Sequence, residues 1–159
     1  MTHLEKLNAT LKLRAYTFFK IPLIFYVSPS IEEINSERCV VRIPLKRRTR
    51  NHLNVMYFGV LATGADCAGG LMAMRLIQES GRNVALLFKD FKADFLKRAE
   101  GDVFFTCEDG AAIRAQVDKA LASDDRVNSP VRVTATVPSL LGSEPVALFE
   151  LTLSLKKRS

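Results

Sequence analysis

The chain has 159 residues and a formal charge of +6 at pH 7, with 48% apolar and 25% charged residues. This length suits a single domain with one hydrophobic core, and the composition excludes a disordered or fibrous protein. The positive charge alone does not identify a partner, because nucleic acid, an anionic membrane surface and a phosphorylated ligand are all attracted by it.

The cysteines and histidines argue against a disulfide framework and against a metal site. The chain has an odd number of cysteines and no C-x-x-C pair; the three cysteines are Cys39, Cys67 and Cys107. His3 and His52 are far apart and have no metal-ligand spacing. We therefore predict a protein of the reducing cytoplasm that has no metal and no cofactor.

The N-terminal residues 3–20 predict an amphipathic helix, because apolar side chains recur near helical spacing. The apolar run 16–27 is interrupted by Lys20 and Pro22 and is shorter than the about 20 residues that cross a bilayer. We expect no cleavable signal here, and a helix and connecting segment packed on the body; a membrane-surface anchor is the alternative. The predicted apolar face of the helix consists of Leu4, Leu7, Leu11, Tyr16 and Phe19.

Residues 31–46 predict two short strands or a hairpin. Val41 and Ile43 alternate with Arg42 and Lys46, as in a strand with one buried face.

Residues 51–74 form an apolar segment with a single carboxylate, Asp66. A helix that is hydrophobic all round is either buried in a protein core or placed in a membrane. A charge near its middle, several glycines and flanking strand-like segments argue against a membrane span. We therefore predict a buried core helix that ends near Ser80 and Gly81.

The remaining chain predicts strands over 83–96 and 102–107, an outer helix over 109–122, and two antiparallel neighbouring strands over 131–137 and 147–154. An antiparallel sheet curled around one apolar helix follows from this order. Dimerisation through the sheet edge or the helix would close the side that remains open.

The element order and residues 51–66 together resemble the hotdog-fold thioesterases, most nearly the phenylacetate-pathway-type acyl-CoA thioesterases. That motif runs from an asparagine, across a loop to His-Gly-Gly at the start of the central helix, and on to an acid two turns later. Asn51, Gly59 and Asp66 match the asparagine, the second glycine and the acid without insertion or deletion. Tyr57 and Phe58 replace the histidine and the first glycine.

The resemblance also covers 92–102, which looks like the strand, turn and strand that follow the helix in that family. It implies an α+β hotdog fold, an antiparallel sheet wrapped around a long central helix, with an added N-terminal helix. The expected division is an N-terminal helical extension over 1–30 and a hotdog domain over 31–159.

In such an enzyme the backbone N–H of Gly59 would donate to the developing oxyanion; alternatively, this glycine lets the helix start close to another backbone. Asp66 is about 10 Å further along the helix, so the resemblance implies a site shared by two subunits. Asp66 of one would be general base or nucleophile, while Asn51 and Gly59 of the other hold the carbonyl and the water. The alternative for Asp66 is a buried acid satisfied by local partners.

The other candidate residues have a structural alternative each. Asn51 is also typical of a helix cap or a turn. Tyr57 either donates a hydrogen bond to the substrate, with Phe58 beside it at the substrate, or belongs to the core. Thr63 either reaches the substrate or bonds back to its own helix. The arginines of the basic tract would bind the phosphates of coenzyme A, or they simply form the solvated end of a strand. They are Arg47, Arg48 and Arg50.

The leading hypothesis is hydrolysis of an acyl-CoA or acyl-carrier-protein thioester by a homodimer or a dimer of dimers. The second hypothesis is a non-catalytic hotdog module that binds an acyl thioester or lipid-like ligand, because the histidine and first glycine are replaced. Binding of nucleic acid through residues 46–50 ranks last, since no recognition motif accompanies the charge. We expect no nucleic-acid partner and no membrane span.

Overall fold

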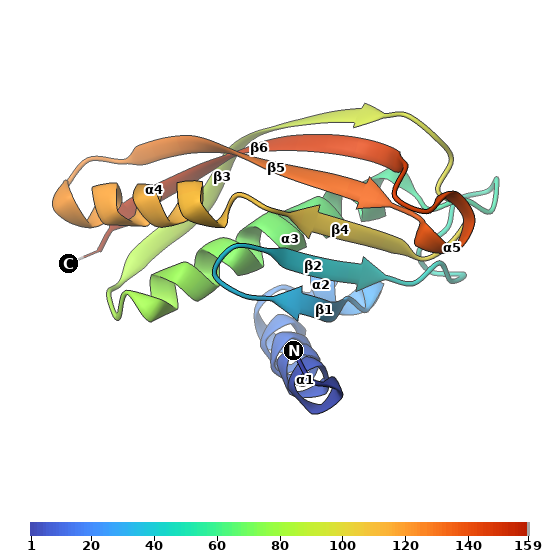
Figure 1. Cartoon of the computed structure of the whole chain (residues 1–159), viewed down its shortest axis with the longest axis horizontal. Helices are drawn as coiled ribbons and strands as arrows, with labels where there is room; N and C mark the ends of the chain where they lie inside the picture. Colours follow the sequence, from blue (N-terminus) through green and yellow to red (C-terminus); the bar gives the residue numbers. More distant parts are fainter. Residues whose placement is uncertain (159) are drawn as a thin grey trace.

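The computed structural model describes residues 1–158 and shows a six-stranded antiparallel sheet wrapped around one long helix (Figure 1). Ser159, the last residue of the predicted domain 31–159, lies outside the described residues. The elements in chain order are α1 (His3–Lys20), α2 (Pro22–Val27), β1 (Ser30–Ile34), β2 (Cys39–Ile43), α3 (Phe58–Glu79), β3 (Val84–Phe95), β4 (Val103–Cys107), α4 (Gly110–Ala122), β5 (Val127–Thr136), α5 (Pro138–Leu141) and β6 (Pro145–Lys157).

The predicted fold class is confirmed. The strands are ordered β1-β2-β4-β5-β6-β3 and every pair is antiparallel, including β5 and β6. The predicted helices and strands all occur, and the structure adds the short helices α2 and α5. The strands β3 and β4 follow each other in the chain but lie apart in the sheet, so residues 96–102 cross from the edge of the sheet to its middle. The division at residue 30 stays a prediction.

The core lies between the inner face of the sheet and α3. Alternate residues of each strand point inward, and Val103, Phe105 and Cys107 of β4 are fully buried. A Cβ atom at Gly64 would lie 2.2 Å from Cζ of Phe105, so the helix and sheet approach closely because this residue is glycine. By length and composition α3 could cross a membrane, but in this fold it is the core helix, as predicted.

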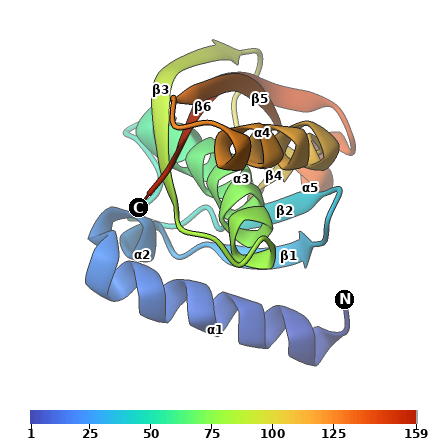
Figure 2. The ribbon, with the colours of Figure 1, turned by 90° about the vertical axis from the view of Figure 1, so that its left-hand side faces the viewer.

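The helix α1 lies across the side of α3 that the sheet leaves open (Figure 2). It is attached to β1, because Thr10 Oγ1 accepts a hydrogen bond of 3.0 Å from the backbone N–H of Ile31. A capping box of Thr2 and Glu5 fixes its start.

The predicted apolar face of α1 is wrong. The buried residues are Thr10, Leu13 and Thr17, whereas Leu4, Leu7, Leu11, Tyr16 and Phe19 are exposed. The physical reason is that α1 contacts the rim of the sheet through hydrogen bonds, and only Leu13 among its large apolar residues is buried against the body. The following helix does pack on the body, through Ile24 and Val27.

Candidate functional site

A pocket of about 520 Å³ lies at the N-terminal end of α3. Its walls come from the loop before α3 and from the segment that leaves β3. Three predicted site residues, Asn51, Tyr57 and Phe58, meet there. The ring of Phe58 lies 6.5 Å from that of Phe95, which closes the pocket on the side of the sheet edge.

Asn51 orders the loop that precedes the helix. Its Oδ1 accepts hydrogen bonds from the backbone N–H groups of Leu53 at 2.9 Å and Val55 at 3.4 Å. Asn51 is therefore the turn residue that one of the two interpretations predicted. Its Nδ2 group donates to no acceptor among residues 1–158 and stays available at the pocket.

The first turn of α3 presents unpaired backbone donors. The N–H groups of Val60 and Leu61 both bond to the carbonyl of Tyr57, the N-cap residue. The N–H groups of Phe58 and Gly59 have no acceptor within the described part of the chain. Two free donors at the positive end of a 22-residue helix favour an oxyanion.

Gly59 and Tyr57 depend on each other. A Cβ atom at Gly59 would lie 2.6 Å from Cε1 of Tyr57, so the glycine makes room for this ring. The atoms nearest to that Cβ position belong to a side chain and not to another backbone, so the alternative role of Gly59 stays a prediction. Placing Tyr57 in the core is also wrong, since the residue is 46% exposed and lines the pocket.

Asp66 lies in a different cavity, two turns further along α3. This cavity of about 90 Å³ is apolar and is closed by α1 and α2 through Leu13, Ile21 and Ile24. Burial raises the pKa of the Asp66 carboxyl, and no hydrogen bond or opposite charge in residues 1–158 lowers it. The interpretation of Asp66 as an acid satisfied by local partners is therefore wrong. A raised pKa brings a carboxylate closer to the value that suits a general base near neutral pH.

Thr63 lies between the two cavities on the same face of α3. Its hydroxyl donates to the carbonyl of Gly59 at 2.8 Å, so it bonds back to its own helix, as one interpretation predicted. Gly59 and Asp66 are about 10 Å apart along the helix axis. Within one chain the structure therefore unites Asn51, Tyr57 and Phe58 at the donors, but does not bring Asp66 to them.

The predicted arginines do not line this pocket. Arg48 bonds to Ser28 and its guanidinium lies 5.7 Å from the ring centroid of Tyr26, while the backbone of Arg50 pairs with Met56. All three, including Arg47, are exposed.

The cations that line the pocket are Lys97 and Arg98, which the sequence analysis missed. Lys97 also forms an ion pair of 2.5 Å with Glu144. The two cations are adjacent in the sequence directly after the predicted strand 83–96, and this was the signal that could have identified them.

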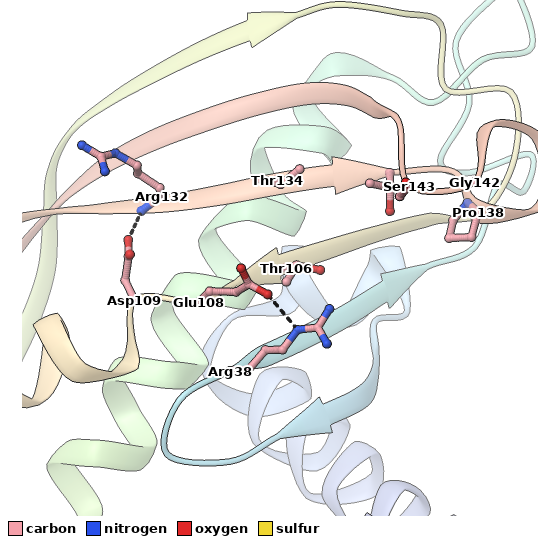
Figure 3. A pocket seen from close by; sticks show the side chains of 10 residues that line it. Arg38, Thr106, Glu108, Asp109, Arg132, Thr134, Pro138, Gly142 and Ser143 are labelled. Carbon is pink, nitrogen blue, oxygen red and sulfur yellow. Dashed lines mark hydrogen bonds and ion pairs between the residues drawn. The ribbon is translucent and has the colours of Figure 1, made fainter.

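Another hollow, of about 760 Å³, is on the outer face of the sheet, away from α3 (Figure 3). Its charged groups are already paired: Arg38 contacts Glu108 at 3.3 Å, and Asp109 accepts from the backbone N–H of Arg132 at 2.6 Å. None of the predicted site residues lies there. Residues 1–158 contain no cluster of three metal-ligating side chains.

A sheet wrapped around a central helix, with backbone donors where that helix begins, defines the hotdog class of thioesterase-like folds. The chain belongs to the family described as "Domain of unknown function (DUF4442)", whose profile matches residues 10–143. No curated protein is significantly similar to the sequence.

Solved structures share the fold over nearly the whole chain. A Chlorobaculum tepidum protein of unknown function has a TM-score of 0.82 at 14% identity, covering 96% of this chain and 97% of its own. A putative thioesterase from Shewanella oneidensis has a TM-score of 0.77 at 13% identity, covering 94% and 97%. A Pseudomonas aeruginosa protein described as a probable thioesterase has a TM-score of 0.74 at 23% identity, covering 94% and 96%. At these identities the likeness shows the fold.

Proposed function

We propose that the protein is a thioesterase that hydrolyses an acyl-CoA or acyl-carrier-protein thioester at a site shared by two copies of the chain. The observation that carries the proposal is Asp66, a half-buried carboxylate without a partner in residues 1–158 and with a raised pKa. An unpaired carboxylate in an apolar cavity is costly for folding, which favours a functional reason for keeping it.

The edge strand β3 supports a second copy. It has 12 residues and pairs only with β6 in the described structure. Its inward-pointing residues Phe91 and Phe95, after the register shift in the strand, are half exposed. Long edges with exposed apolar residues are rare in monomers, so a homodimer would cover them. A dimer of dimers is a further assembly that the proposal allows.

In the proposed reaction, Asp66 of one copy takes a proton from a water molecule that attacks the thioester carbonyl carbon. The oxyanion forms at the free N–H groups of Phe58 and Gly59 of the other copy, and Asn51 Nδ2 positions the water or the carbonyl. The oxyanion then collapses to the carboxylic acid and the C–S bond breaks, and the leaving thiolate takes the proton that Asp66 received from the water. Direct attack by Asp66 on the carbonyl is the alternative course.

Cations at the pocket suit the phosphates of the carrier. Lys97 and Arg98 line it, and the tract that contains Arg47, Arg48 and Arg50 lies exposed next to the same loop in the chain. This assignment favours coenzyme A or the phosphopantetheine arm of a carrier protein. The reducing cytoplasm stays the predicted location.

The test is thiol release from short, medium, long and aryl acyl-CoAs, with wild type beside Asp66→Asn. We expect the variant to lose about 100-fold or more in kcat, because general-base catalysis contributes about 10²–10⁴-fold. The matched control is Asp118→Asn, which changes an exposed carboxylate on α4. Equal turnover by wild type and Asp66→Asn would refute the role of Asp66.

The second candidate function is a non-catalytic module that binds an acyl thioester. The replacement of the family histidine and first glycine by Tyr57 and Phe58 favours it. Tight binding of acyl-CoA by a folded dimer, with no thiol release from any substrate, would select this alternative.

A further inference from the structure

We infer that the acyl group is a medium or long alkyl chain, held in an apolar groove between α1 and α3 that starts at Asp66. This inference rests on the proposed function, since it takes the thioester carbonyl to lie at Asp66. The groove itself is defined by two cavities, of about 90 Å³ and about 400 Å³.

The two cavities adjoin each other, because four residues line both of them: Leu13, Tyr16, Leu71 and Met74. Only the smaller one contains Asp66. The larger one continues toward the C-terminal end of α3, where Gln78 is a wall residue.

The wall residues of the two cavities follow one another in order along both helices. On α1, Thr17 lines only the cavity at Asp66, whereas Ala9 lines only the larger cavity. On α3, Gly70 lines only the former and Gln78 only the latter. The two helices therefore run in opposite directions along the same groove, with α1 held at its middle by the hydrogen bond between Thr10 and Ile31.

The chemistry of the walls suits an alkyl chain. The polar side chains in the wall of the larger cavity are Lys12, Tyr16, Arg75 and Gln78, and the other six wall residues are apolar. The Arg75 guanidinium is already engaged, because it donates to the carbonyl of Ile34 at 3.1 Å and to Glu79 at 2.9 Å. Lys12 is exposed, so its ammonium group can stay in water at the surface of the groove. The thioester end of the ligand is placed at Asp66 because the proposed reaction needs its carbonyl there.

The charge at Asp66 discriminates between ligands. An ionised Asp66 repels the carboxylate of a free fatty acid, whereas a neutral thioester carbonyl carries no such charge. The same repulsion would favour release of the fatty acid after hydrolysis.

The length of the groove sets the length of the chain. Met74 and Gln78 are eight and twelve residues beyond Asp66, or about 12 Å and 18 Å along the helix. Three bonds of an extended backbone span about 3.3–3.6 Å, and thus about 1.2 Å per bond. The groove therefore accommodates an acyl chain of about 10–15 carbons, and a small aryl acyl group would leave most of it empty.

The test measures binding without catalysis, using the thioethers S-hexyl-, S-decyl- and S-tetradecyl-CoA, which a thioesterase does not cleave. We expect wild type to bind S-decyl-CoA at least about tenfold more tightly than S-hexyl-CoA, because each methylene that enters the groove leaves water. Met74→Trp, at the junction of the cavities, should erase this gain. Ala9→Trp, at the far end, should weaken only S-tetradecyl-CoA.

The control is Leu148→Trp on the outer face of the sheet, which should bind all three compounds like wild type. Equal affinity for all chain lengths in wild type, or an unchanged chain-length profile in both groove variants, would overturn the groove even if the protein hydrolyses acyl-CoAs. Chain-length selectivity that both variants change as expected, in a protein without thiol release, would keep the groove and refute the hydrolase. Ala9→Trp alters a partly exposed position on α1, so it tests the groove even if Met74→Trp fails to fold.

Discussion

The two faces of α3 use small residues for opposite purposes. Toward the sheet, Gly64, Ala65 and Ala68 are buried, and a Cβ atom at Gly64 would collide with the ring of Phe105. Small residues on this face bring the helix onto the sheet, as the close packing of protein interiors requires.

Elsewhere on the helix, Gly59 and Gly70 adjoin residues of the proposed site, and Gly70 also adjoins Phe88 of β3. A Cβ atom at Gly59 would meet the ring of Tyr57, whereas one at Gly70 would lie 3.7 Å from Oδ1 of Asp66. One helix therefore carries both the core and the proposed site, and we expect the same substitution to affect stability on one face and activity on the other.

The largest effect on stability is expected at the sheet-facing glycine. Gly64→Ala would place a methyl group 2.2 Å from Cζ of Phe105, which is fully buried and has no room to move. We expect a loss of about 1–3 kcal/mol in the free energy of unfolding, measured by urea titration. Activity per folded molecule should remain. A loss below about 0.5 kcal/mol would mean that the packing of helix on sheet is looser than described.

At the site-facing glycine the effect should fall on catalysis. Gly59→Ala would push the exposed ring of Tyr57 aside, at little cost in stability, and disturb the donors at the helix start. We expect kcat/KM to fall about tenfold, less than the about 10²–10³-fold in kcat for loss of an oxyanion donor. In a Tyr57→Ala background the same substitution should cost less, because the collision is gone. Equal costs in both backgrounds would contradict the coupling of the two residues.

Gly70→Ala is a milder change on the site face. The added methyl would meet Asp66 and Phe88 at ordinary contact distances of 3.7 Å, and alanine is the better helix former. We expect a gain of about 0.5–1 kcal/mol in the free energy of unfolding, opposite in sign to Gly64→Ala. A destabilised variant would show that the space beside Asp66 is tighter than these contacts indicate.

The sequence was sufficient to predict the helices and strands, including the central helix. Hydrophobic periodicity reports local structure, so the strands, α1, α3 and α4 were predicted near their observed bounds. Asp66 was noticeable because it is the one carboxylate in an apolar segment, and burial does raise its pKa. No nearby donor opposes this shift in the described structure.

The errors arose where tertiary structure decides the outcome. Leu4, Leu7 and Leu11 have helical spacing, yet spacing does not say which face of α1 meets the body. The pocket cations Lys97 and Arg98 reach the start of α3 only because residues 96–102 cross the sheet end, where the Met56 N–H bonds to the Ala99 carbonyl. No local pattern contains that crossing.

The smallest expected effect concerns the charge on Asp66 and its pH dependence. Burial raises the pKa of its carboxyl, so in the interval above the ordinary value of about 3.9 the folded protein keeps a proton that the unfolded chain has released. Ionisation therefore lowers stability as pH rises from about 4 through the folded pKa. We expect Asp66→Asn to raise Tm at neutral pH, measured by thermal unfolding, with a gain that vanishes toward about pH 4.

Asp102→Asn is the matched control, for which we expect a change in Tm of the opposite sign. Asp102 lies directly before β4. Partial burial alone would raise the pKa of the Asp102 carboxyl, but the Leu45 N–H and the Arg42 guanidinium, at 2.9 and 2.6 Å, hold it below its ordinary value. Its stabilisation is present at neutral pH and is lost as pH falls through the folded pKa, so the variant should lower Tm at neutral pH and approach wild type in acid. If both substitutions lowered Tm at neutral pH, Asp66 would have a stabilising partner that the isolated chain does not supply, and the shared site of two copies would be the first place to look for it.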